Sequence, residues 1–265
     1  MKKRNAVLIA MAAAAAISGC AGGNNVQTEY SEVETTSKPA ATAQVEANVS
    51  NVVTAASRKT EEASSRTLIA YFTWADNTVV EDKDAAVQSA LDHYASIGDS
   101  SNYAGVDAVS SASVVQPGNV AQMASWIQGE IGGDLFSIQV TEPYSSDYDE
   151  CMERASEERA DQKRPELTEK VDNMDSYDVV AIGYPNWWSG VPMPVLSFIE
   201  QNNLAGKKII LFCSHGTGGL ARSVREITDE LPSDCSVEKN VLGIYRADIP
   251  GGQPKVQQWL KEIGY

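Results

Sequence analysis

Basic residues are scarce in this chain of 265 residues. Lysine and arginine number 21 against 36 aspartate and glutamate residues, which gives a formal net charge of −15 at pH 7. A surface that binds nucleic acid needs clustered lysine and arginine to neutralise phosphates. The composition therefore argues against nucleic acid as a partner. The acidity could steer basic proteins toward the chain, although solubility alone also accounts for it.

Cysteine is also scarce, and the spacing of the four cysteines shows no recognisable metal site. Cys151, Cys213 and Cys235 lie far apart in the chain, and Cys20 lies near its N-terminus. Neither the paired spacing of zinc ligands nor a complete disulfide framework can be read from them. A single disulfide stays open if the compartment is oxidising. Cys213 ends an apolar run and is most simply a small core residue.

Two nucleotide-binding signatures are missing. The chain has no P-loop with its lysine, and no G-x-G-x-x-G segment follows a predicted strand. These motifs bind nucleoside triphosphates and dinucleotides, so neither class of ligand is indicated. A phosphate would instead have to be held by hydroxyl groups and by backbone amides at the N-terminus of a helix.

The first twenty residues predict export. Residues 2–4 are basic, residues 6–17 are apolar but too few for a mature membrane-spanning helix, and Ile17-Ser-Gly-Cys20 follows. This tetrapeptide resembles a lipobox, which implies that residues 1–20 are a lipoprotein signal peptide and that Cys20 carries the lipid. We therefore expect an extracytoplasmic protein that is anchored to the cell membrane by the lipid on Cys20. The alternative is an ordinary secretory signal with an incidental cysteine.

Composition divides the rest of the chain into two parts. Residues 21–66 are rich in alanine, serine, threonine, asparagine and glutamate and have no sustained apolar period, so we expect a disordered tether. Residues 67–265 are enough for one large hydrophobic core and too few for two comfortable domains. One folded domain is expected there.

Short apolar segments alternate with amphipathic segments along this domain. The pattern is typical of an α/β fold in which helices cover both faces of a parallel sheet. Strands are predicted at residues 67–72, 134–140, 178–184, 208–214 and 237–245. Helices are predicted at residues 119–131, 148–162, 192–202, 219–231 and 253–263.

The loops after the first, third and fourth predicted strands carry candidate ligand-binding residues. Parallel strands end at one edge of a sheet, and open α/β sheets bind their ligands there. The first loop contains Thr73, Trp74 and Ala75, the second contains Pro185, Asn186, Trp187 and Trp188, and the third contains Ser214, His215, Gly216 and Gly218. The glycines allow close backbone approach, and the short polar side chains supply hydrogen bonds. The two indoles could present flat faces to a planar cofactor, or both could fill the gap between the sheet and the next helix.

Two of these segments resemble the flavodoxins. They are Tyr184-Pro-Asn-Trp-Trp188 and Phe212-Cys-Ser-His-Gly-Thr-Gly-Gly219, and the resemblance extends over about residues 67–262. It implies a doubly wound, five-stranded parallel sheet of order 2-1-3-4-5 and one noncovalently bound FMN. The Trp-Trp and Ser-His-Gly loops would lie beside the flavin ring, and the first loop would surround the phosphate.

In function, the resemblance implies electron transfer between redox partner proteins. An enzyme on the same fold, an NAD(P)H-dependent FMN or quinone reductase, is the first alternative, because a nicotinamide site made of loop surface leaves no motif. A binding module that has kept the fold and lost FMN is the second. His215 could hydrogen-bond a flavin oxygen, or its imidazole could simply bond the backbone of its own loop.

The predicted phosphate loop departs from the flavodoxin pattern. Residues 73–78 begin like that loop, but the matching helix start is the segment Pro117-Gly-Asn-Val-Ala-Gln-Met-Ala124. Residues 76–116 are therefore predicted to be an insertion. Gly118, Asn119 and Val120 would then hold the phosphate at the start of the helix.

This placement leaves two difficulties and an alternative. Val120 lacks the hydroxyl group that the pattern expects, and Asp76 would repel a nearby phosphate. Ser111, Ser113 and Thr78 are candidates to supply the hydroxyl. The alternative is that residues 76–78 form the phosphate loop themselves.

The insertion contains a weak helical pattern at residues 85–93. Loops of this length are usually functional or disordered. It could be a cover over the flavin, a surface for a partner, or a solvated excursion. His93, within it, is predicted to be exposed and without a chemical role.

Overall fold

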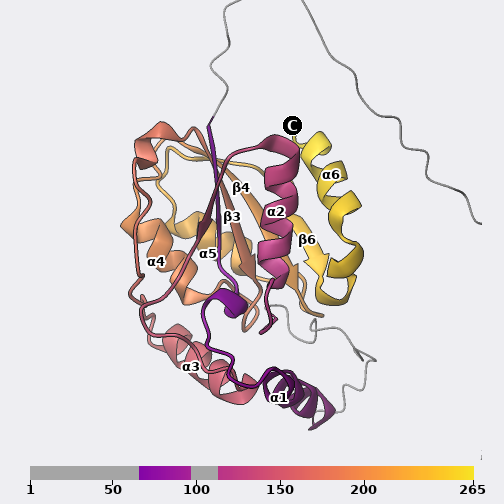
Figure 1. Cartoon of the computed structure of the whole chain (residues 1–265). Helices are drawn as coiled ribbons and strands as arrows, with labels where there is room; N and C mark the ends of the chain where they lie inside the picture. Colours follow the sequence, from indigo (N-terminus) through magenta and orange to yellow (C-terminus); the bar gives the residue numbers. More distant parts are fainter. Residues whose placement is uncertain (1–65, 97–112) are drawn as a thin grey trace, which may run out of the picture. The chain divides into compact units, whose positions relative to one another are not determined.

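The computed structural model describes residues 66–96 and 113–265 (Figure 1). The predicted signal peptide, Cys20 and residues 21–65 of the predicted tether lie outside the described residues. Arg66, which we assigned to the tether, is described and contacts the folded domain. Its guanidinium forms an ion pair of 3.0 Å with Asp134, and its backbone amide donates to the carboxylate of Asp178.

A parallel sheet forms the centre of the domain. Its strands are β1 (Thr67–Tyr71), β2 (Asp134–Ser137), β3 (Val179–Pro185), β4 (Lys208–His215), β5 (Ser236–Val237) and β6 (Leu242–Tyr245). The order is β2-β1-β3-β4-β5, and β6 also pairs with β4. The α/β fold and the order 2-1-3-4-5 predicted from the sequence are therefore confirmed.

The last predicted strand is interrupted, so the sheet has six strands rather than five. Glu238, Lys239 and Asn240 between β5 and β6 are polar, and Asn240 bonds the C-terminal helix. Its side chain donates to Glu262, and its carbonyl accepts from the indole of Trp259 at 2.7 Å. The Glu238 amide still donates to the Ile209 carbonyl of β4, so the break between the two strands lies at residues 239–241.

The helices cover both faces of the sheet. Their bounds are α1 (Lys83–Ser96), α2 (Asn119–Ile131), α3 (Tyr148–Ala160), α4 (Met193–Gln201), α5 (Ser223–Glu230) and α6 (Gln253–Glu262), with short 3₁₀ turns η1 (Trp74–Asp76), η2 (Met174–Ser176) and η3 (Arg246–Gly251). Helices α2 and α6 pack together on one face, α4 and α5 lie on the other, and α1 and α3 lie at the lower end of the view in Figure 1.

Helix α2 shows why the apolar period was a reliable guide. Val120, Met123, Ala124 and Ile127 recur at helical spacing, and all four are buried against the sheet. The helix ends at Gly132, whose φ of 71° is the left-handed conformation that favours glycine at a helix end. The predicted and observed bounds of this helix agree.

Packing within the sheet also demands a glycine in β3. A Cβ on Gly183 would lie 2.2 Å from the ring of Phe212, its partner in β4. The aromatic ring therefore crosses the neighbouring strand where that strand has no side chain.

No helix of residues 66–96 and 113–265 is long and apolar enough to cross a membrane. Over the same residues no group of three or more histidine, cysteine, aspartate or glutamate side chains could hold a metal ion. Cys151, Cys213 and Cys235 are free thiols, and Cys213 is buried in the core as predicted.

Candidate functional site

The end of β1 lies against the start of α2. Thr73 is fully buried, and a Cβ on Gly118 would lie only 2.1 Å from the Thr73 hydroxyl oxygen. Two segments that are 45 residues apart in sequence therefore meet with no space for a side chain between them. Ala75, also buried, completes this turn after β1.

The N-terminus of α2 is suited to an anion. Gly118 occupies the capping position without a side-chain cap, and the first turn contains no acidic residue. The amides of a first helical turn and the helix dipole together favour a phosphate at a helix start. Ser113 brings its hydroxyl to this point, where it accepts from the Asn119 amide at 2.9 Å. The Asn119 side chain in turn reaches the hydroxyl of Ser214 at 3.5 Å.

Val120 points away from the place where Thr73, Gly118 and the start of α2 meet, which we call the cradle. Its side chain is fully buried in the core beneath α2, so a hydroxyl at this position would face the sheet. Ser113, one of the three residues considered for the missing hydroxyl, bonds the Asn119 amide at the start of α2. Ser111, a second, lies outside the described residues.

Residues 76–78 are occupied by structural contacts. The Asn77 amide donates to the carbonyls of Thr73 and Ile138, and its oxygen accepts from the Val140 amide. Thr78 donates to the Tyr144 carbonyl at 2.9 Å. These side chains join the ends of β1 and β2, which favours Gly118 and Asn119 over residues 76–78 as the phosphate-binding segment.

Asp76 is turned toward β2. Its carboxylate accepts from the Ser137 hydroxyl at 2.7 Å. Burial, and then the nearby Asp76 charge, raise the pKa of Tyr71 above its ordinary value. The carboxylate that we expected to repel a phosphate is thus held by a neighbouring strand.

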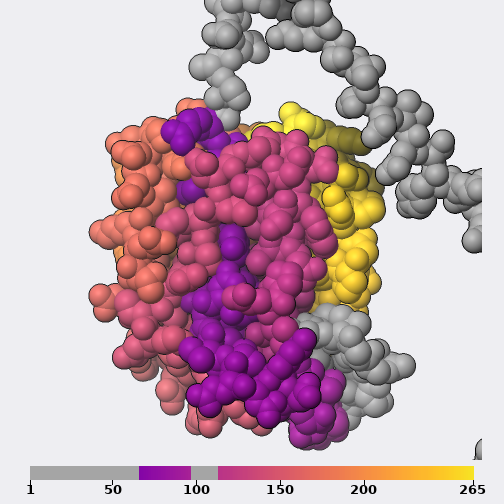
Figure 2. Space-filling model, viewed as in Figure 1, coloured from indigo at the N-terminus to yellow at the C-terminus, as the bar shows by residue number. Residues whose placement is uncertain are grey.

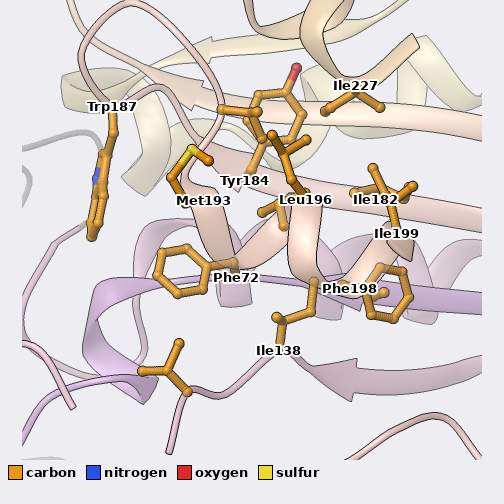
Figure 3. Close-up of a cluster of buried hydrophobic side chains, with 14 of the residues drawn as sticks. Phe72, Ile138, Ile182, Tyr184, Trp187, Met193, Leu196, Phe198, Ile199 and Ile227 are labelled. Atoms are coloured by element: carbon orange, nitrogen blue, oxygen red, sulfur yellow. The ribbon is translucent and has the colours of Figure 1, made fainter. Parts of the chain in front are cut away.

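The two tryptophans after β3 have different surroundings. Trp187 and Gly190 exchange two backbone hydrogen bonds, which closes a tight turn around Trp188 and Ser189. Trp187 is 6% exposed and meets the ring of Phe72 edge-on at 5.4 Å between centroids (Figure 3). It meets the ring of Tyr144 in the same way, also at 5.4 Å. Trp188 is 46% exposed. One indole therefore fills the core, and the other is accessible at the edge of the sheet.

Trp188 adopts a strained backbone conformation. Its φ is 50° and that of Ser189 is 58°, in the left-handed region that bulky side chains rarely occupy. The indole NH donates to the Met152 carbonyl at 3.0 Å, which fixes the side chain against α3. Strain of this kind concentrates at functional sites.

A partly buried charge cluster supports this turn. Glu226 of α5 accepts from Arg159 at 2.8 Å and from the Val191 amide at 2.9 Å. Arg222 bonds the same carboxylate and donates to the Trp188 carbonyl. Partial burial alone would raise the pKa of Glu226, but the hydrogen bonds from Arg159 and Val191 outweigh it and hold that pKa below its ordinary value.

The loop after β4 is tied to the loop after β3. The Asn186 amide donates to the Ser214 carbonyl at 2.9 Å, and the Asn186 side chain donates to the Gly219 carbonyl. His215 directs Nδ1 at the Gly216 carbonyl, 2.8 Å away. Because a carbonyl only accepts, Nδ1 carries a proton and Nε2 is the nitrogen left for another contact. The sequence left open whether His215 bonds the backbone of its own loop or a flavin oxygen. Nδ1 makes the backbone bond.

The remaining predicted residues complete this edge. Pro185 is the last residue of β3, Trp74 is buried in η1, and Gly216 and Gly218 lie in the loop after β4. The structure thus brings together the carboxyl ends of β1, β3 and β4 and the start of α2.

Sequence reasoning missed three residues at this edge. Arg246 directly follows β6 and is 4% exposed, and its Nη1 donates to the Tyr94 hydroxyl at 2.6 Å. The Tyr94 hydroxyl lies 3.0 Å from that of Tyr148. Arg246 could have been found, because the end of a further parallel strand reaches the same edge. Tyr94 could not, since nothing in the sequence shows that α1 returns to the sheet.

His93 was also misjudged. It is partly buried, its ring lies 4.8 Å from that of Tyr148, and its Nδ1 is 2.6 Å from the Asp149 carboxylate. The expectation of an exposed, unengaged histidine was wrong. The weak helical pattern at residues 85–93 concealed the longer helix α1, which packs against α3.

Comparison with known families shows to which family the chain belongs. A family model described as Flavodoxin matches residues 106–262, more than half of the chain. The chain belongs to the flavodoxin family. No curated protein matches this flavodoxin.

Solved structures agree with the fold. A protein from Bacteroides eggerthii described as a flavoprotein is 24% identical, with a TM-score of 0.50, over 76% of this chain and 99% of its own. One from Bacteroides uniformis is 22% identical, also with a TM-score of 0.50, over 74% and 98%. A flavoprotein from Lactobacillus acidophilus in complex with FMN is 18% identical, with a TM-score of 0.45, over 74% and 98%. At these identities the two Bacteroides structures show the fold alone.

The different surroundings of the tryptophan pair lead to opposite expectations for one substitution. Trp187→Ala should lower the free energy of unfolding by about 3 to 5 kcal/mol, because it empties a packed aromatic site. Trp188→Ala should change it by less than about 1 kcal/mol, and Trp188→Asn should be the more stable of the two, since asparagine tolerates the left-handed region. Urea unfolding of the three variants measures this. Equal losses for the two alanine variants would contradict the assignment.

The charge cluster predicts a pH dependence. A carboxyl group whose pKa is lowered by folding contributes stability above its unfolded pKa, about 4.3, and loses it as the pH falls through the lower folded value. The melting temperature of the wild type should therefore fall as the pH drops below about 5. Glu226→Gln should lower the melting temperature at pH 7 and flatten this part of the profile. Asp229→Asn, at an exposed position of the same helix, should keep the wild-type profile; a Glu226→Gln curve parallel to wild type would count against the role of Glu226.

Proposed function

We propose that this flavodoxin binds one FMN noncovalently at the carboxyl edge of its sheet and passes electrons between redox partner proteins. The observation that carries the proposal is the meeting of Thr73, Gly118 and the start of α2. This cradle fits a phosphate because it combines hydroxyl groups with the N-terminus of a helix, has no acidic residue in its first turn, and leaves no room for a Cβ.

The chain's own residues divide the work of binding. Thr73, Gly118, Asn119 and Val120 would hold the phosphate through the hydroxyl and the backbone. The loops after β3 and β4 would line the ring, with the exposed Trp188 offering an aromatic face. FMN, when bound, supplies the redox chemistry, and the protein sets its orientation and electrostatic surroundings.

Binding is the first test. The chain without residues 1–20 should purify yellow with about one FMN per chain. Gly118→Ala should weaken FMN binding at least about tenfold, because the new Cβ displaces the Thr73 hydroxyl from the cradle. Gly129→Ala is the matched control in the same helix, where a Cβ meets nothing within 4 Å, and should bind as the wild type does. Quenching of FMN fluorescence measures both.

Three outcomes separate the proposal from its alternatives. A colourless wild-type chain that does not quench FMN fluorescence would reject FMN binding and favour a module that has lost the cofactor. Bleaching of the yellow protein by NADPH would favour a reductase. Equal binding by Gly118→Ala and Gly129→Ala would reject the start of α2 as the phosphate site.

We place this activity outside the cytoplasm, with the protein anchored to the cell membrane by a lipid on Cys20. The support is the sequence of residues 1–20, in which small residues precede the cysteine. Two acyl chains on one cysteine give a stable anchor without a membrane-spanning helix. The acidic tether and domain would then meet redox partners in the aqueous phase.

Replacement of the cysteine tests the anchor. Cys20→Ser should leave unprocessed precursor or release an unlipidated protein, because the thioether that carries the lipid cannot form. Membrane fractionation and the mass of the N-terminal peptide measure this. Normal processing and membrane retention of the variant would rule the anchor out.

A further inference from the structure

Helix α1, which belongs to the insertion in the phosphate loop, is docked at the carboxyl edge of the sheet. In Figure 2 it forms the purple surface at the lower end of the molecule, below α2. Ser89 accepts from the Tyr148 amide at 3.0 Å, and His93 lies 2.6 Å from the Asp149 carboxylate. Both contacts hold α1 to the start of α3.

Tyr94 joins α1 to a second element, the end of β6. Its hydroxyl accepts from Arg246 Nη1, and the guanidinium carbon lies 4.4 Å from the centre of its ring. Arg246 follows β6, so α1 is held at once by α3 and by the end of the strand beside β4. The helix therefore crosses the edge at which the candidate site lies.

The same guanidinium lies beside the loop after β4. A Cβ on Gly216 would lie 3.3 Å from Arg246 Nη1, so the glycine leaves space next to that group. At the other end, Tyr148 meets Trp74 edge-on at 6.1 Å, directly after β1. Contacts that hold α1 thus adjoin two of the three loops that the proposed function assigns to FMN.

The docking of α1 combines polar contacts with a modest apolar face. Two small residues, Ala86 and Ala90, are buried, and Val87, Leu91 and Tyr94 are partly buried against the core. A helix without a large, fully buried side chain can detach at a free energy below that of global unfolding. Helix α2 packs in a different core cluster, on the other face of the sheet.

We propose that α1 is a cover over the cofactor site, latched by Tyr94 and Arg246, and that it opens to admit and release FMN. The proposal rests on the FMN-binding function proposed above. Opening of α1 precedes both binding and release of FMN. A weaker latch therefore raises the fraction of open molecules, and with it the rate constants of FMN association and of FMN dissociation.

Tyr94→Phe breaks the latch with the smallest change. It removes the hydroxyl that bonds Arg246 and Tyr148 and keeps the ring under the guanidinium. Tyr177→Phe is the matched control, because it also removes one tyrosine hydroxyl, bonded to Asp134 at 2.7 Å, at the opposite end of the sheet. Arg246 is buried whereas Asp134 is exposed, so the free energy of unfolding of both variants is measured first and the local effects are compared after that difference is known.

Two measurements on the full mature chain test the proposal. Hydrogen exchange without FMN should speed up in the α1 amides of Tyr94→Phe by about fivefold, and not in those of Tyr177→Phe. Stopped-flow quenching should show faster FMN association and faster dissociation in Tyr94→Phe by similar factors. A merely structural contact would speed dissociation alone.

The outcomes are distinct. Unchanged α1 exchange in Tyr94→Phe would show that no latch exists, and faster exchange with unchanged FMN association would show that α1 is no cover; either result overturns the proposal. A wild-type chain that binds no FMN overturns the function proposed above and the gating of FMN with it. In that case the exchange experiment still decides whether Tyr94 latches α1.

Discussion

Parallel pairing of β3 with both β1 and β4 is the constraint on which the candidate site depends. The pairing aligns Tyr71 with Gly183 and Gly183 with Phe212, so the three strands end at one edge. It continues beyond the strands, because the Asn186 amide bonds the Ser214 carbonyl. Three loops from distant parts of the chain therefore meet without any covalent link between them. Each loop can then be specialised by its own side-chain contacts while the sheet keeps their spacing.

The sequence was a good guide wherever one physical requirement dominated. Helix α2 was predicted to the residue because its apolar period, its glycine start and its glycine end all agree. The order of the strands followed from the alternation of apolar and amphipathic segments together with the flavodoxin resemblance. The edge loops followed from the ends of the strands.

Prediction failed where contacts between distant segments decide the outcome. Trp187 and Trp188 are chemically identical neighbours, and only the turn closed with Gly190 separates a core indole from an accessible one. His93 has no distinguishing local pattern, and its environment depends on where α1 docks. The interruption between β5 and β6 depends on contacts of Asn240 with α6. No local pattern contains this information.

An insertion of about forty residues within the phosphate loop is tolerable for a simple reason. The entropy lost on closing a loop grows only with the logarithm of its length, so extra residues cost little once both ends are fixed. Here the ends are fixed strongly. Asn77 binds three backbone groups on one side, and Ser113 bonds the start of α2 on the other.

The contacts of Arg66 have a consequence for how the domain can be approached. Arg66 bonds Ser176, Asp134 and Asp178. These contacts lie beside the first residues of β1, β2 and β3, so the chain enters the sheet at the amino ends of its strands. The loops after β1, β3 and β4 lie at the carboxyl ends of the strands. The residue at which the domain begins and the loops that carry the candidate site are therefore at opposite ends of the parallel strands.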